Sequence, residues 1–161
     1  MKKIFPIKRL TKIISTQKKA GKTVVLANGC FDLIHIGHIR YLKSASHMGD
    51  ILVVAINSDS STNRIKGSGR PILDQKQRAE ILASFCFVDY ITIFNENDVS
   101  KVLFALKPDI QVKGDDYTEK TVPEKDIVQD YGGKVAIAGG PKIKSTSDII
   151  RKIQKKQNAN S

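Results

Sequence analysis

Short apolar runs alternate with amphipathic stretches along most of the chain. Five mainly apolar runs have the length of buried strands, and they are predicted at Thr23–Asn28, Ile51–Asn57, Tyr90–Phe94, Asp109–Lys113 and Lys134–Ala138. Between and around these runs, apolar residues recur three or four positions apart, which is typical of helices with one buried face. Such helices are predicted at Arg9–Lys19, Gly37–His47, Asp74–Phe85, Val99–Leu106, Pro123–Tyr131 and Thr146–Lys156.

The order of these elements predicts the fold class. Strands that alternate with helices are typical of a parallel sheet covered by helices on both faces. We therefore expect one doubly wound, Rossmann-like α/β domain over residues 1–161, with an N-terminal helix at about 8–20 and a core at about 22–154. A polar loop is expected from Ser58 to Arg70. In such folds, ligands bind at the carboxyl ends of the strands.

Composition narrows the class of protein. The hydrophobic fraction of 40% and the charged fraction of 27% are ordinary for a globular domain, and no apolar run is long enough to span a membrane. The first residues lack the apolar stretch of a signal peptide, so we expect a cytoplasmic protein. Two cysteines, Cys30 and Cys86, are too few for a disulfide framework or a metal-binding knuckle.

The net charge of +11 is confined to the two ends of the chain. Residues 1–22 hold eight Lys or Arg and no acid, and residues 141–161 hold six against one acid. The 118 residues between them carry 13 basic and 15 acidic groups. The simplest interpretation is a solvated lysine face, and no specific nucleic-acid partner is expected. The alternative is a non-catalytic, basic module that contacts RNA or anionic lipid.

The end of the first predicted strand carries the strongest chemical signal. The sequence of residues 28–38 is NGCFDLIHIGH, in which His35 and His38 flank Gly37 where a helix is expected to begin. Helix N-termini attract anions, imidazoles donate hydrogen bonds to phosphoryl oxygens, and glycine permits close approach of a nucleotide. The segment therefore predicts a phosphate site. We expect no metal site, because His47 is the only other histidine and no cysteine pair lies nearby.

The segment GCFD-(two residues)-HIGH resembles the signature of the HxGH nucleotidyltransferases, which include cytidylyltransferases and adenylyltransferases that act on phosphorylated small molecules. Four further segments are similar, in the same order, to the adenylyltransferase half of the bifunctional heptose-7-phosphate kinase/heptose-1-phosphate adenylyltransferases. They are NSDSSTNRIKG at 57–67, RPI at 70–72, QR at 77–78 and VKGDDY at 112–117. The resemblance covers roughly residues 22–154.

This resemblance implies roles for individual residues. His35 and His38 would bind the nucleotide phosphates and stabilise the α-phosphoryl transition state, and Lys66 would contact phosphates from a basic loop, with Arg64 or Arg70 beside it. The nucleotide-binding positions implied by the family are Gly29, Cys30, Phe31, Asp32, Gly37, Arg78, Gly114, Asp115, Tyr117, Ser145 and Thr146.

Simpler interpretations stay open at several of these positions. Asp115 is implied near the base and ribose, yet it and Asp116 could form only a turn with Gly114. Ser145 and Thr146 are implied to hold the β- and γ-phosphates, yet Ser145 could be only an N-cap. Lys66 could be an exposed surface charge.

The resemblance implies a reaction. An oxygen of a sugar 1-phosphate, expected to be D-glycero-D-manno-heptose 1-phosphate, would attack the α-phosphorus of ATP, giving ADP-heptose and pyrophosphate, with Mg²⁺ carried on the triphosphate. The alternative is a cytidylyltransferase for glycerol 3-phosphate or a related alcohol phosphate. The GGPKIK sequence at 139–144 argues against it, because cytidylyltransferases tend to have Arg-Thr-x-Gly there. A homo-oligomer is also expected, since the apolar stripe of the last helix can pack on the sheet or on a second subunit.

Overall fold

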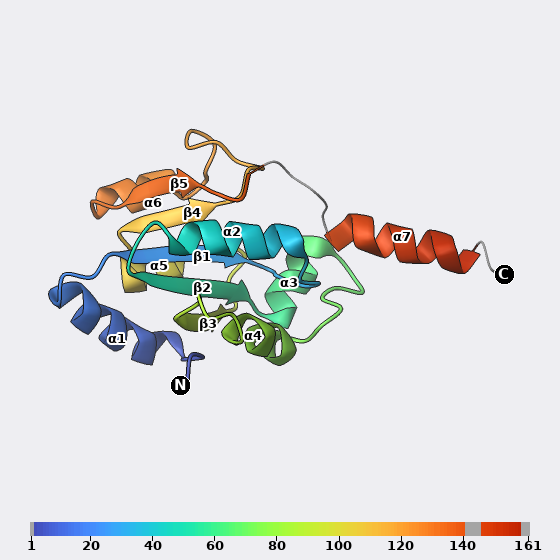
Figure 1. The fold of residues 1–161 in the computed structure, drawn as a ribbon, viewed down its shortest axis with the longest axis horizontal. Coiled ribbons are helices and arrows are strands. Elements are labelled where there is room, and N and C mark those ends of the chain that lie inside the picture. Colours follow the sequence, from blue (N-terminus) through green and yellow to red (C-terminus); the bar gives the residue numbers. More distant parts are fainter. Residues whose placement is uncertain (1, 141–145, 159–161) are drawn as a thin grey trace.

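The computed structural model describes residues 2–140 and 146–158, and its five strands form one parallel sheet in the order β3-β2-β1-β4-β5 (Figure 1). The strands are β1 (Val24–Gly29), β2 (Ile51–Asn57), β3 (Tyr90–Phe94), β4 (Ile110–Lys113) and β5 (Lys134–Ile137). The helices of the described residues are α1 (Ile7–Lys19), α2 (Ile36–Ser46), α3 (Asp59–Lys66), α4 (Gln75–Ala83), α5 (Ser100–Leu106), α6 (Lys125–Asp130) and α7 (Thr146–Asn158). The expected Rossmann-like α/β fold is confirmed.

The sheet is buried on both faces. Along β1, Val24 and Leu26 pack with α1, α5 and α6, whereas Val25 and Ala27 pack with α2 and α4. The alternation follows from the two-residue period of a strand. Because both faces of β1 and β2 are covered, residues 24–27 and 51–56 are continuous apolar runs, whereas β4 carries the buried polar residues Gln111 and Lys113.

Three aspartates fix the alignment of the strands at their amino ends. Asp50, Asp89 and Asp109 each precede a strand, and each pairs twice with one residue in or just before the neighbouring strand. The backbone N–H of the aspartate donates to that residue's carbonyl, and its carboxylate accepts that residue's N–H. The partners are Thr23, Leu52 and Val24, respectively, with carboxylate-to-nitrogen distances of 2.8 Å. Each pairing satisfies a backbone donor at a strand start and opposes slippage between strands.

The prediction of a polar loop from Ser58 to Arg70 is wrong for most of this segment, because α3 forms within it. Ser58 caps this helix by accepting the N–H of Ser61 at 3.2 Å. Inside the helix, Ser61 and Thr62 are buried although both are polar. Their hydroxyls form hydrogen bonds with neighbouring groups, so a nearly all-polar sequence still supplies a buried face.

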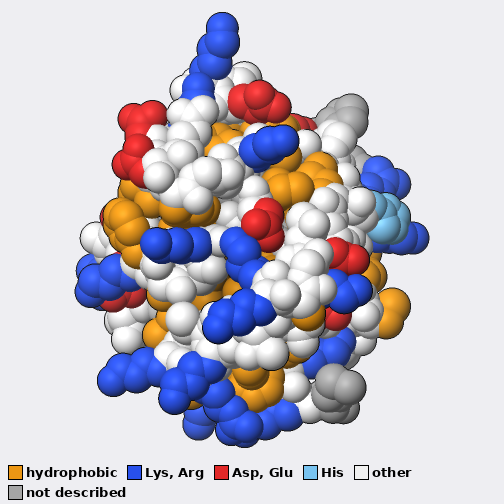
Figure 2. All heavy atoms as spheres, turned by 90° about the vertical axis from the view of Figure 1, so that its left-hand side faces the viewer, with side chains coloured by type: hydrophobic (Ala, Val, Ile, Leu, Met, Phe, Trp, Pro, Cys, Tyr) orange, Lys and Arg blue, Asp and Glu red, His pale blue; other side chains and the backbone are white. Residues whose placement is uncertain are grey.

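The basic N-terminal region lies away from the carboxyl ends of the strands. Figure 2 shows the side of the molecule at the amino ends of the strands, where Lys and Arg side chains gather along the lower part of the view. Exposed members on and before α1 are Lys2, Lys8, Arg9, Lys12 and Lys19. At the other side, α7 leads away from the sheet (Figure 1). Within the described residues, none of the helices has the length and apolarity to cross a membrane.

Candidate active site

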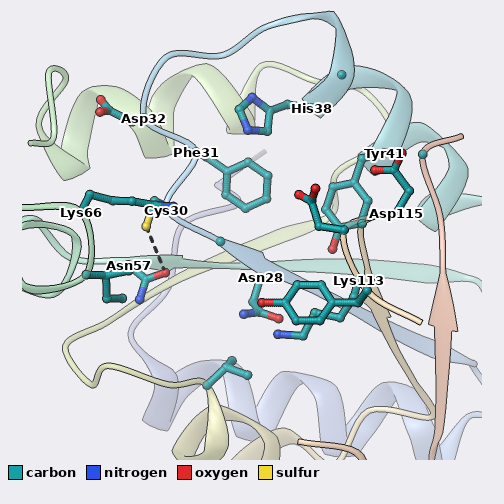
Figure 3. A pocket seen from close by; sticks show the side chains of 18 of the residues that line it. Asn28, Cys30, Phe31, Asp32, His38, Tyr41, Asn57, Lys66, Lys113 and Asp115 are labelled. Atoms are coloured by element: carbon teal, nitrogen blue, oxygen red, sulfur yellow. Dashed lines mark hydrogen bonds between the residues drawn. The ribbon is translucent and has the colours of Figure 1, made fainter. Parts of the chain in front are cut away.

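A cavity of about 770 Å³ lies at the carboxyl ends of the strands. Its walls come from the segment between β1 and α2, from α3 and the loop after β3, and from the loops after β4 and β5 (Figure 3). Most of the residues predicted from the sequence line it, namely Gly29, Cys30, Phe31, Asp32, His35, Gly37, His38, Lys66, Gly114, Asp115 and Tyr117. The topology therefore brings these predicted residues, from three separate segments of the chain, to one cavity.

The two histidines of the HIGH segment form a pair at the start of α2. His35 is the N-cap, and its Nδ1 accepts the N–H of Gly37 at 3.1 Å. Nδ1 of His38 in turn accepts the N–H of His35 at 3.4 Å, and the two ring centroids lie 3.9 Å apart. Since both Nδ1 atoms are acceptors, each neutral ring carries its proton on Nε2. Each ring therefore keeps one N–H to donate to a phosphoryl oxygen.

Burial keeps both imidazoles neutral. It lowers the pKa of His38 to about 4, and the neighbouring His35 lowers it further in the same direction. Burial also lowers the pKa of His35. At pH 7 the free protein thus presents two neutral donors, and bound phosphates would bring the negative charge that favours protonation.

Phe31 supports the histidine pair from below. Its ring centroid lies 5.3 Å from that of His38 and 6.4 Å from that of Tyr41, and its side chain is buried. A Cβ at Gly29 would lie 3.2 Å from the Phe31 ring, so glycine leaves room for it. Tyr41 donates a hydrogen bond to the Val112 carbonyl at 2.7 Å and so ties α2 to β4.

Asp32 holds the loop that carries Arg70. Its Oδ1 accepts the N–H groups of Ile72 and Leu73 at 2.8 and 3.1 Å, and its Oδ2 accepts Nε–H of Arg70 at 2.6 Å. Asp32 is only 2% exposed. Its carboxylate lines the cavity, but these three contacts make it a positioning group that holds Arg70 at the cavity wall.

Arg78 corrects an expectation from the family resemblance, which implied contact with the nucleotide. Its side chain is completely buried and does not line the cavity. The guanidinium donates to the carbonyls of Cys30, Asn57 and Leu73 and pairs with Asp59 at 2.7 Å. Arg78 therefore joins the ends of β1 and β2 beneath the cavity. The sequence alone does not reveal that Arg78 is buried, because the residues next to an arginine in the sequence do not distinguish a buried arginine from an exposed one.

Lys66 lies at the opposite wall from the loop after β4. It is in the last turn of α3 and exposed, and its side chain extends into the cavity near Cys30 (Figure 3). The Cys30 thiol donates to Oδ1 of Asn57 at 3.8 Å. This wall presents the cations Lys66 and Arg70, which suits it to a second phosphate.

The ends of β1 and β4 contain two functional candidates that the sequence did not single out. Lys113, the last residue of β4, is buried and forms an ion pair with Glu124. Asn28, at the end of the neighbouring β1, lines the same part of the cavity. The available signal was weak: a lysine that closes an apolar strand is also typical of a strand end at the surface. Only the fold shows that this lysine is buried.

The side chains of two expected residues, Ser145 and Thr146, are not described by the structure. Ser145 lies outside the described residues. Thr146 is the first residue of α7, and nothing is described of its side chain. Farther along α7, Arg151 lines the cavity. The last helix therefore contributes a basic residue to the site.

The described residues do not form a metal cage. No group of three His, Cys, Asp or Glu within 2–140 and 146–158 is arranged to hold a metal ion. A cation such as Mg²⁺ would need several oxygen ligands.

Comparison with known proteins identifies the family. The family model described as cytidylyltransferase-like matches residues 26–158, which is most of the chain. The chain belongs to the cytidylyltransferase-like family. The resemblance inferred from the HIGH segment is thereby confirmed.

Relatives of this family member are considerably longer. It is 45% identical over 151 residues to the bifunctional protein HldE of Geobacter metallireducens, covering 94% of this chain and 31% of that protein. Identity to the Campylobacter jejuni HldE is 44% over 151 residues, covering 94% and 32%. The chain thus spans about a third of the length of these relatives.

Solved structures agree with the fold. A lipopolysaccharide core biosynthesis protein from Thermoplasma volcanium superposes with a TM-score of 0.60 at 34% identity, over 73% of this chain and 94% of that one. A pantoate-beta-alanine ligase from Francisella tularensis, solved with a β,γ-ATP ligand and β-alanine, has a TM-score of 0.64 at 20% identity, over 91% and 69%. The second likeness supports the fold alone.

The pKa of His38 gives a first test of this family member's site. In the free protein we expect NMR to show the His38 ring taking up a proton only near pH 4, because burial opposes its charge. Adding ATP should raise this pKa, since the phosphates favour the imidazolium. ATP binding would then take up protons between the free and bound pKa values. Resonances of His47, exposed and outside the cavity, serve as the control; a His38 pKa unmoved by ATP would contradict the phosphate contact.

Replacement of Arg78 tests its supporting role. Arg78→Met should lower the free energy of unfolding by about 3 kcal/mol or more, because several backbone carbonyls lose their donor inside the protein. Lys66→Met removes one exposed cation and should change it by less than about 0.5 kcal/mol. Urea unfolding measures both. An Arg78→Met protein of unchanged stability would restore the expectation of a direct nucleotide contact.

Proposed function

We propose that this chain transfers AMP from ATP to heptose 1-phosphate and releases ADP-heptose and pyrophosphate. The observation that carries the proposal is the histidine pair at the start of α2, whose Nδ1 atoms both accept backbone N–H groups, inside a cavity that also presents Lys66 and Arg70. Similarity to HldE proteins supports the heptose acceptor, and the similarity to a lipopolysaccharide core biosynthesis protein is in accord with it.

The reaction needs little chemistry from the protein. An oxygen of the acceptor phosphate attacks the α-phosphorus of ATP in line, and the bond from that phosphorus to the bridging β-oxygen breaks. Pyrophosphate leaves with that electron pair. The attacking phosphate is already ionised, so no general base is required. The protein's part is to hold two polyanions together and stabilise the charge on the α-phosphoryl oxygens.

Each wall of the cavity has a part in this proposal. His35 and His38 donate from Nε2 to the α-phosphoryl oxygens, and Gly37 leaves room for them. Lys66 and Arg70 bind the phosphate of the acceptor on the α3 side.

The loops after β4 and before α7 complete the proposed nucleotide site. Gly114, Asp115 and Tyr117 line the cavity, and we propose that they contact the nucleoside, as the family resemblance implies. We propose that Ser145 and Thr146 hold the β- and γ-phosphates, as the family resemblance implies.

Mg²⁺ belongs to the nucleotide in this proposal. It would enter on the triphosphate and offset part of its charge, with water completing its shell. No step is assigned to it here, because the described residues offer it no cage.

Two other functions are distinguished from the proposed one by their substrates. A cytidylyltransferase for an alcohol phosphate would use the same histidine pair with CTP. A non-catalytic RNA- or membrane-associated module would use the basic face near α1, which lies away from the cavity (Figure 2). Homo-oligomer formation and a cytoplasmic location stay predictions.

A nucleotide panel tests the proposed reaction. With heptose 1-phosphate as acceptor, pyrophosphate release should be at least about tenfold faster in kcat/KM with ATP than with CTP, because pockets that pair with a base reject one with other donors and acceptors. Glycerol 3-phosphate with each nucleotide is the control. Faster release from CTP and glycerol 3-phosphate would support the cytidylyltransferase instead.

His38→Ala tests the histidine assignment separately. Loss of one preorganised donor typically costs about 3 kcal/mol of transition-state stabilisation, so kcat should fall at least about a hundredfold. The melting temperature should stay close to that of the unmodified protein, because the His38 ring is only partly buried and its hydrogen bond to the His35 N–H is long, at 3.4 Å. His47→Ala, the same change outside the cavity, should leave kcat unaffected. A His38→Ala protein that fails to fold would indicate a core role.

A further inference from the structure

The cavity continues around the carboxyl edge of the sheet to the face covered by α5 and α6. Along each strand, successive side chains point to opposite faces of the sheet, so Asn28 lies on the same face as Leu26, which packs with α5 and α6. Lys113 of the adjacent β4 lies on this face too, because Gln111, two residues earlier, pairs with Leu26. Figure 3 shows Asn28 and Lys113 together below β1, with Phe31, His38 and Tyr41 above it. The phosphate-binding groups and this second group therefore lie on opposite sides of the strand edge.

This second part of the cavity is built from buried polar groups. Lys113 and Glu124 are each only 7% exposed. Nζ of Lys113 donates to Oε1 of Glu124 at 3.1 Å, and it lies 5.5 Å from the centre of the Tyr117 ring. Burying both charges is costly, and a purely structural contact could be made by apolar side chains of similar volume. The retention of two buried charges at a cavity wall points to a ligand.

Two oxygens here lack a hydrogen bond. Oε2 of Glu124 is 3.1 Å from Nζ of Lys113 in the ion pair but makes no hydrogen bond, and Oδ1 of Asn28 has none either. Both atoms are buried, and both residues line the cavity. Buried polar atoms are normally hydrogen-bonded, so these two acceptors have capacity for a donor that the ligand supplies.

The combination matches one ligand chemistry. An unpaired amide oxygen, a carboxylate oxygen that can accept a further hydrogen bond and an ammonium group together suit hydroxyls, which both donate and accept. Tyr117 adds an aromatic face on the same side. Because the Lys113 ammonium is already paired with the Glu124 carboxylate, this position offers no net positive charge to a phosphate. Adjacent hydroxyls of a sugar ring fit the arrangement.

We propose that Asn28, Lys113 and Glu124 form a subsite for the adjacent hydroxyls of a sugar ring, which fixes the substrate relative to the histidine pair. The ring belongs either to the ribose of ATP or to the acceptor sugar. The inference depends on the proposed function only for the choice of acceptor probe, because the nucleotide half of the test requires no turnover.

The test uses a pair of substitutions that preserves charge balance. Lys113→Met/Glu124→Leu removes both charges together, because loss of one partner alone would leave a buried charge and threaten the fold. Asn28→Val removes the other free acceptor without touching the ion pair. Lys120→Met and Glu119→Gln are the controls, since both residues are exposed on the same loop and outside the cavity.

Calorimetry with ATP, 2′-deoxy-ATP and 3′-deoxy-ATP forms the first half of the test. If the ribose occupies the subsite, the unmodified protein binds ATP at least about tenfold more tightly than one of the deoxy forms. In the double variant and in Asn28→Val, the affinity for ATP should fall to the affinity that the unmodified protein has for that deoxy form. The affinity of these variants for the deoxy form itself should equal that of the unmodified protein. The two controls should behave as the unmodified protein does.

Steady-state kinetics with heptose 1-phosphate forms the second half. If the acceptor sugar occupies the subsite, the variants bind all three nucleotides normally, and KM for heptose 1-phosphate rises at least about tenfold with little change in kcat. Two results would overturn the proposal. One is wild-type nucleotide discrimination together with a wild-type acceptor KM. The other is an equal weakening of every ligand with a lower melting temperature, which a contact that merely holds the loop would produce.

Discussion

The site depends on one buried cation. Arg78 has no exposure to solvent, and its guanidinium holds the carbonyls of Cys30 and Asn57, which follow or end β1 and β2. It also pairs with Asp59 at the start of α3. A guanidinium is suited to this position because its planar fork donates in several directions at once and it stays charged. The histidine-bearing segment and the lysine-bearing helix are therefore held at a fixed separation.

A second set of polar contacts extends this framework to the cavity walls. Asp32 holds the loop of Arg70, and Tyr41 ties α2 to β4. The first contact joins the Arg70 loop to the segment that follows β1, and the second joins α2 to the inner strand β4. Catalysis by charge stabilisation needs donors that are already in place, since reorienting them during the reaction would cost part of the stabilisation. The buried network supplies that rigidity without placing its own charges on the substrate.

Most of the excess positive charge of this family member lies outside the cavity. The large basic excess lies on the terminal segments, and the side at the amino ends of the strands displays much of it (Figure 2). The cavity has few cations, two of which are paired with buried carboxylates, Arg70 with Asp32 and Lys113 with Glu124. The overall charge of the chain is therefore a poor guide to its site. In the proposed reaction, neutral imidazoles contact the α-phosphoryl oxygens, and Lys66 and Arg70 supply the positive charge for the acceptor phosphate.

The sequence by itself determined the sheet, because parallel strands buried on both faces require continuous apolar runs. It also located the histidine pair, since the local order of His35, Gly37 and His38 at a strand end is sufficient. Tertiary structure alone decided what lies buried. It buried Arg78 beneath the cavity and paired Lys113 with Glu124. It also turned the polar segment after Ser58 into the helix α3, which Ser58 caps. These outcomes depend on contacts between distant segments, and a polar residue's local sequence does not record whether its partner is water or protein.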